Sequence, residues 1–179
     1  MAPLAVTIYS VPFSLPGLVL AALVGLLASR PLGRALGAHP IVAWAIVASV
    51  GLILAATLTP VPGADDPARG GLACDLSRIG LAPWRRLTSV NEVSLNILLL
   101  VPLGLALGLL PRSRPKVGLV AAAAALPLAI EVAQAVATPL HRACQSADVF
   151  DNLTGLALGL LAGGAAGALD ARRAPAARG

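Results

Sequence analysis

The stretch that decides the fold is "IEVAQAVATPLHRACQSADVFDNLTGLALG", residues 130–159. Its two ends are apolar enough to lie in lipid, whereas its middle carries charged and amide side chains: Glu131, Gln134, Arg142, Asp148, Asp151 and Asn152. A charged side chain within a membrane span costs about 3 kcal/mol on insertion scales, so it usually faces a partner or a water-filled cavity. The stretch therefore predicts two spanning helices joined at a polar site.

Composition sets the class of protein. Hydrophobic residues make up 58% of the chain and charged residues 12%, about half the charged share of a soluble domain. Apolar runs approach the roughly 20 residues that a helix needs to cross a bilayer, and they cover residues 11–29, 41–59, 93–110, 117–138 and 148–169. We predict an all-α polytopic membrane helix bundle with about five transmembrane helices, forming a single membrane domain over residues 1–179.

The basic residues predict the orientation, because Lys and Arg beside spanning helices tend to stay in the cytoplasm. With the N-terminus outside and the C-terminus inside, three basic groups face the cytoplasm: Arg30 and Arg34, then Arg112, Arg114 and Lys116, then Arg172, Arg173 and Arg178. Residues 60–92 then form an extracytoplasmic loop, although that loop carries four arginines. The first run is expected to be a retained helix and not a signal peptide, because its arginines follow it.

In this topology the polar residues of three helices lie at one level, in the extracytoplasmic leaflet of the membrane. Glu131 and Gln134 share one helix face by their spacing of three, and Asp148 and Asn152 share another by their spacing of four. Asn96 lies near the outer end of the third helix, one turn below Glu92, and Arg142 in the loop is the expected counter-charge. Asp151 is expected to cap the start of the last helix.

Small residues indicate how these helices pack. Gly155, Gly159, Gly163 and Gly167 recur at intervals of four on the last helix, and Gly104 and Gly108 do so on the third. Such spacing lets helix backbones approach closely in lipid. We expect these glycines to draw the polar helices together.

The motifs "NILLLVPLG", "EVAQ" and "RACQSADVFDNLTGLALG" resemble the VanZ-like family of bacterial membrane proteins. The matching positions, which make residues 93–169 the best-matching core, are Asn96, Pro102, Gly104, Glu131, Gln134, Arg142, Asp148, Asn152 and Gly155. Many members have a further acidic residue where this chain has Gln145. Asp151 is the carboxylate in this chain that could substitute for it. The resemblance implies a cell-envelope protein, in a family named after a protein associated with resistance to teicoplanin, a lipid-bearing glycopeptide antibiotic.

Three roles fit the polar residues: a buried network that fixes helix register, a binding site, and a catalytic site. The leading hypothesis is a non-enzymatic envelope protein that binds or shields against an amphiphilic ligand, such as a lipoglycopeptide or a lipid-linked wall intermediate. The alternatives are a membrane-embedded enzyme acting on a lipid headgroup with Glu131 or Asp148 as acid or base, and a small transport or assembly subunit. No residue is assigned a catalytic role.

Other kinds of site are not expected. His39 and His141 fall on opposite sides of the membrane, so they make no zinc site, and no phosphate loop or nucleotide signature is present. We therefore predict no metal and no cofactor. The partners expected are membrane lipid and the amphiphilic ligand, with no nucleic acid, since cytoplasmic flanks facing anionic lipid account for the basic pI. The oligomeric state is not predicted.

The two cysteines predict a disulfide. Cys74 and Cys144 both fall outside the cytoplasm in a topology chosen without them, where thiols tend to be oxidised. Their bridge would hold the long loop over the polar residues as a lid.

The orientation is testable by thiol labelling. In a background lacking both native cysteines, a cysteine placed beside Lys116 should resist a membrane-impermeant maleimide in intact cells, because the basic turn is predicted to be cytoplasmic. A cysteine beside Asp65 should react. Labelling in the opposite sense would reverse the predicted orientation.

Overall fold

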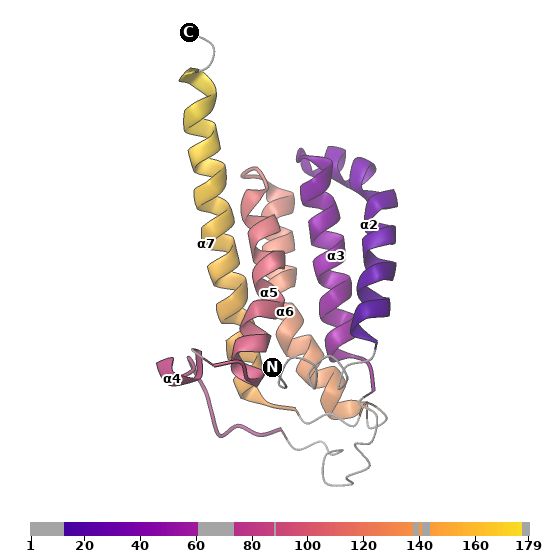
Figure 1. Cartoon of the computed structure of the whole chain (residues 1–179), viewed down its shortest axis with the longest axis vertical. Coiled ribbons are helices and arrows are strands. Elements are labelled where there is room, and N and C mark those ends of the chain that lie inside the picture. The colour runs from indigo at the N-terminus through magenta and orange to yellow at the C-terminus, as the bar shows by residue number, and fades with distance from the viewer. Residues whose placement is uncertain (1–12, 61–73, 88, 138–139, 141–143, 177–179) are drawn as a thin grey trace.

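A computed structural model describes residues 13–60, 74–87, 89–137, 140 and 144–176 of the chain. Five long helices stand side by side in this part (Figure 1), namely α2 (Ser14–Leu36), α3 (Pro40–Thr57), α5 (Glu92–Leu109), α6 (Arg114–Val136) and α7 (Ser146–Ala176), and a single turn, α4 (Trp84–Leu87), lies at one end. Each of the five is long and apolar enough to cross a membrane. The predicted multi-pass helix bundle is confirmed.

Two helices continue further than their apolar runs. The first run was expected to end at residue 29, but α2 continues through Arg30, Pro31 and Arg34 to Leu36, and Gly37 then ends it with φ 62°. α7 likewise extends past residue 169 to Ala176. The expected ends were wrong because hydropathy marks where a helix leaves hydrocarbon, whereas its backbone hydrogen bonds continue into the interface where charged side chains are solvated.

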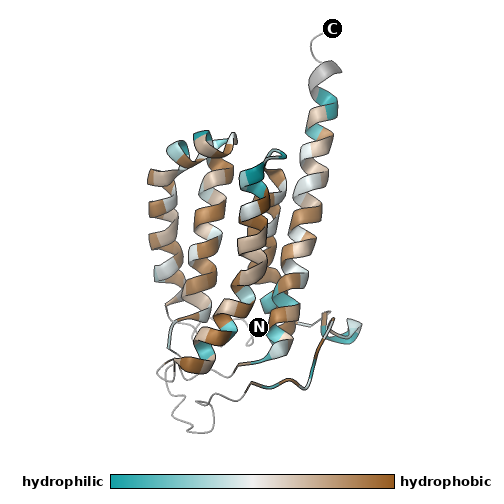
Figure 2. Ribbon diagram, turned by 180° about the vertical axis from the view of Figure 1, so that it is seen from behind, coloured by the Kyte–Doolittle hydropathy of each residue, from teal (hydrophilic) through white to brown (hydrophobic). Residues whose placement is uncertain are grey.

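The helices alternate in direction along the chain, so α5 and α7 run parallel (Figure 1). α2 packs along α3, α3 contacts α5, and α5 packs along α7, while α6 contacts both α5 and α7. The buried core lies between α3, α5, α6 and α7 and is formed by residues such as Ile53, Leu100, Leu103, Leu107 and Leu156. Figure 2 shows the hydrophobic residues along the helix walls and polar residues gathered near the helix ends, as lipid on the outside requires.

Glycines bring α5 and α7 into backbone contact. A Cβ atom added to Gly155 would lie 1.9 Å from the carbonyl oxygen of Ile97, and one added to Gly163 would lie 2.2 Å from that of Leu105. The contacts are reciprocal, because a Cβ on Gly104 would lie 2.3 Å from the Leu156 oxygen. Gly108 and Gly159 lie in the same interface, whereas nothing lies within 4 Å of a Cβ at Gly167.

The α2–α3 pair uses the same close packing, which the sequence reasoning missed. A Cβ on Gly17 would lie 2.2 Å from the Cβ of Ala55, and one on Gly51 would lie 2.0 Å from that of Ala21. The Trp44 indole in α3 also donates a 3.0 Å hydrogen bond to the Ala22 carbonyl in α2. The bundle therefore contains two tight helix pairs, which α3 joins through its contact with α5, and α6 packs against α5 and α7.

Replacing Gly159 with Ala tests the α5–α7 contact. The new Cβ would lie 2.3 Å from the Val101 carbonyl oxygen, so we expect the free energy of unfolding in detergent to fall by about 1–3 kcal/mol, as overpacking usually costs. Gly167→Ala on the same helix meets open space and should leave it unchanged or raise it by up to about 1 kcal/mol, the helix-propensity gain. Equal effects of the two changes would contradict the close contact.

Candidate functional site

The candidate site lies at the end of the bundle where α3 and α6 end and α5 and α7 begin (Figure 1). Asn96, Glu131, Gln134, Asp148 and Asn152 all belong to the helix segments at this end. Arg142 and His141 lie outside the described residues, so the expected pairing of Arg142 with the carboxylates stays a prediction.

The predicted disulfide is present and ties the loop to the start of α7. The α-carbons of Cys74 and Cys144 are 4.6 Å apart. Beside the disulfide the Asp75 N–H donates to the Cys144 carbonyl and the Ser146 N–H donates to the Asp75 carbonyl, both at 2.9 Å, so Asp75 and Gln145 form a short parallel bridge. We call residues 74–80 the strap.

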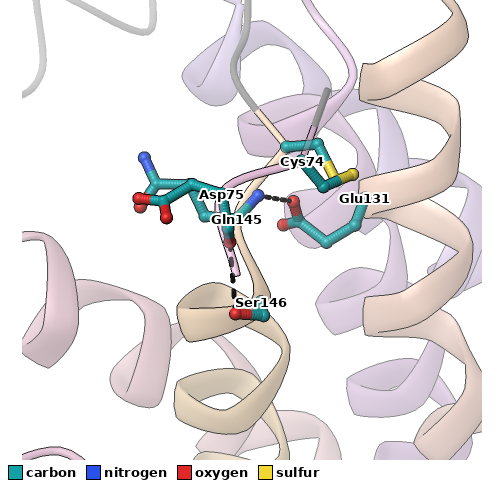
Figure 3. Close-up of a disulfide and its surroundings, with 6 residues drawn as sticks. Cys74, Asp75, Glu131, Gln145 and Ser146 are labelled. Atoms are coloured by element: carbon teal, nitrogen blue, oxygen red, sulfur yellow. Dashed lines mark hydrogen bonds between the residues drawn. A yellow bond between two sulfur atoms is a disulfide. The ribbon is translucent and has the colours of Figure 1, made fainter. Parts of the chain in front are cut away.

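Glu131 fastens α6 to the same place. Its carboxylate is buried, with 4% of the residue exposed, and one oxygen accepts a 2.7 Å hydrogen bond from the Gln145 backbone N–H (Figure 3). Glu131 thus holds the residue that follows the disulfide.

Gln134 links α6 to α3. Its side-chain amide donates a 2.9 Å hydrogen bond to the Thr57 carbonyl, which lies at the last residue of α3. The last carbonyls of a helix have no partner within the helix. Gln134 satisfies one of them in a buried position.

Arg78 of the strap binds Asp151, a contact that sequence reasoning missed. The guanidinium donates from one nitrogen to an Asp151 carboxylate oxygen at 3.0 Å and from the other nitrogen to the second oxygen. The Asp151 residue is 1% exposed. The predicted capping role of Asp151 is wrong, because α7 begins at Ser146 and places Asp151 in its second turn. The sequence did offer one indication of this ion pair, because four arginines in a loop expected outside the cytoplasm suggest that some of them pair with acidic residues.

Two further hydrogen bonds, each with one backbone carbonyl, connect the strap to the start of α7. The Ser146 hydroxyl donates to the Arg78 carbonyl at 2.8 Å, and the Arg78 guanidinium donates to the Ala147 carbonyl at 3.2 Å. Within the strap, the Ser77 N–H donates to the Asp75 carboxylate at 2.8 Å, and this bond holds the pKa of the exposed Asp75 below its usual range. Asp75 therefore accepts this bond as an ionised carboxylate at neutral pH.

Several hydrogen-bond acceptors lie beside the Arg78–Asp151 ion pair. The Asn96 amide lies against the half-buried Asp148 carboxyl, and the Glu92 and Asp151 carboxylates are near enough to act on it electrostatically. One turn along α7, Asn152 is 3% exposed, and its Oδ1 atom has no hydrogen-bond partner in the described structure. We call Glu92, Asn96, Asp148 and Asn152 the acceptor cluster.

The described side chains do not suggest a metal site, since no three His, Cys, Asp or Glu residues among them are grouped to hold an ion.

A sequence model of the VanZ/LLP1 family matches residues 18–165, from α2 to well within α7. The chain belongs to the VanZ/LLP1 family. The match includes the first two long helices in addition to the second-half motifs. No curated protein and no solved structure matches the chain significantly.

Removing Arg78 should destabilise this VanZ/LLP1 protein strongly. In Arg78→Ala the buried Asp151 carboxylate loses its partner, so we expect the free energy of unfolding to fall by about 3–5 kcal/mol. Arg86→Ala, which removes an exposed arginine from α4, should change it by less than about 0.5 kcal/mol. Denaturant unfolding in a mild detergent measures both.

The double variant shows whether the two groups are coupled. Adding Asp151→Asn to Arg78→Ala removes the stranded charge, so the double variant should be more stable than the sum of the single changes predicts. Additive effects would show that the ion pair does not hold the strap to α7.

Proposed function

We propose that this VanZ/LLP1 protein is a non-enzymatic component of the bacterial cytoplasmic membrane that binds an amphiphilic ligand of the cell envelope at the acceptor cluster. The proposed ligands are a lipoglycopeptide of the teicoplanin type and a lipid-linked cell-wall intermediate. In either case the polar headgroup lies in the cluster and the hydrocarbon chain lies in the surrounding lipid.

The Oδ1 atom of Asn152, which has no hydrogen-bond partner among the described residues, is the observation that carries this proposal. A buried acceptor without a donor costs about 1–3 kcal/mol, and a ligand hydroxyl, amide or amine placed there would recover it. Asp148 and Glu92 add further acceptor oxygens to the same cluster. The cluster therefore favours headgroups rich in hydrogen-bond donors, which sugars, peptides and amines supply.

The surroundings favour entry from the membrane. The strap and its disulfide lie at the start of α7, whereas α5 and α7 expose Leu98, Leu158 and Leu161 along their lengths, with 61%, 52% and 72% exposure. An amphiphile can place its chain against such side chains while its headgroup reaches the cluster. A wholly water-soluble ligand would not use this apolar surface.

A binding role suits the described side chains better than catalysis. The Glu131 carboxylate already accepts the Gln145 N–H, and the hydroxyls of Ser94 and Thr154 donate to the backbone carbonyls of Asn91 and Phe150. Nucleophilic catalysis requires a hydroxyl held beside a base. The enzyme alternative would then rest on Asp148 as acid or base.

Replacing Asp148 with Asn tests the proposal. The change keeps the shape of the side chain, and it removes the repulsion from Asp151 and Glu92, so the melting temperature should stay the same or rise. Binding of teicoplanin or of a lipid-linked disaccharide-pentapeptide, measured on purified protein in nanodiscs, should weaken about tenfold, the usual loss for one charge-assisted hydrogen bond.

Asp170→Asn is the matched control, because Asp170 is an exposed acid on the same helix at the opposite end. Its binding should equal that of the parent chain. Unchanged binding by Asp148→Asn would contradict the site, and a fall in melting temperature without loss of binding would indicate a structural role. Cleavage of the lipid-linked probe by the parent protein would support the enzyme instead.

A further inference from the structure

One face of α2 is exposed along nearly its whole length. Its residues follow one another at intervals of three or four, which places them on one side of a helix: Pro16, Leu20, Leu23, Leu27, Arg30 and Arg34. The leucines are exposed by 64%, 55% and 83% in that order. The face is apolar for most of its length and ends in two arginines, an amphiphilic pattern.

Two hollows lie along this face. One of about 480 Å³ is apolar and is lined by Leu15, Pro16, Val19, Leu20 and Leu23. The other, of about 400 Å³, is lined by Arg30, Gly33, Arg34, Gly37, Ala38 and Pro40 at the turn between α2 and α3. Gly33 keeps this turn tight, since a Cβ there would lie 3.0 Å from the Ala38 carbonyl oxygen.

The hollow at the turn is positively charged. Arg30 and Arg34 are exposed, and neither forms a salt bridge with a described residue. Five of the six acids in the described part of the chain lie at the candidate-site end, and the sixth, Asp170, is on α7. The positive end of the α3 dipole at Pro40 adds to the charge of the two arginines.

We propose that this face of α2 binds an anionic phospholipid. The phosphate lies between Arg30 and Arg34, and an acyl chain runs along Leu27, Leu23 and Leu20. Arg30 and Leu20 are ten residues apart, a rise of roughly 15 Å along the helix, which equals about half of the hydrocarbon thickness of a bilayer. The face therefore matches one lipid of one leaflet in both charge and length.

This site is separate from the acceptor cluster and does not depend on the proposed function. It lies at the opposite end of the bundle, where Gly37 approaches the turn that follows α5 at Pro111. A second copy of the chain is a poorer occupant, because a parallel two-fold contact through α2 would bring two pairs of arginines together. Lipid phosphate neutralises them instead.

Native mass spectrometry of the full chain tests the site. The protein is released from micelles with phosphatidylglycerol or with phosphatidylcholine of the same acyl chains, and soluble glycerol 1-phosphate is the arm that tests for phosphate recognition alone. We expect phosphatidylglycerol to bind at least about tenfold more tightly than phosphatidylcholine, as two interfacial arginines allow. Glycerol 1-phosphate should bind far more weakly, because it lacks the chain.

The double variant Arg30→Gln with Arg34→Gln should lose this preference. Arg172→Gln with Arg173→Gln removes the same charge from exposed positions on α7 and should keep it. Equal losses in the two variants would show unspecific attraction by net charge, and tight binding of glycerol 1-phosphate would show a phosphate site without lipid specificity. Either result, or a dimer cross-linked through cysteines at Leu23, would overturn the proposal.

Discussion

Direct backbone contact between α5 and α7 fixes where the polar groups of the candidate site lie. Within lipid there is little hydrophobic drive to bring helices together, so their association depends on close packing and hydrogen bonds. Gly155 and Gly104 allow carbonyl oxygens of the opposite helix to occupy the space of a missing Cβ. Because the glycines of α7 recur at intervals of four, this contact sets which faces of the two helices meet and how closely, and the observed register pairs Gly155 with Ile97. In this register Asn96 lies against Asp148.

The strap adds a covalent bond and an ion pair to the packing of the apolar helices. The disulfide spans 70 residues, and closing a loop of that length contributes roughly 4–5 kcal/mol in the chain-entropy model. The Arg78–Asp151 pair contributes less net stability, because desolvation offsets most of its attraction. Its effect is positional, since a buried carboxylate accepts only a partner with matching geometry. The disulfide keeps the strap close, and the ion pair selects its position on α7.

The sequence predicted those features that depend on local composition. Hydropathy located the five spans, and the assignment of both cysteines to one side of the membrane predicted the disulfide. The partner of Asp151 was not predictable in this way, because Arg78 lies 73 residues away and the loop charges were weighed only against one another. The α2–α3 contact was missed because Ala21 and Ala55 supply half of its small residues, and alanine is too common in this chain to mark a contact.

The two ends of the bundle differ in charge, and this difference bears on how a ligand could be selected. At the candidate-site end, Glu92 and Asp148 lie among acceptors with one described guanidinium, Arg78, acting on Asp148. These carboxylates repel the phosphate of anionic lipids and equally the diphosphate of a lipid-linked wall intermediate, so the charge at this end would favour the lipoglycopeptide of the two proposed ligands. Arg30 and Arg34 at the other end attract the same lipids. A headgroup rich in hydrogen-bond donors would meet little competition from anionic lipid at the acceptor cluster. The carboxylates that repel anionic lipid there are the same groups that would accept hydrogen bonds from the headgroup.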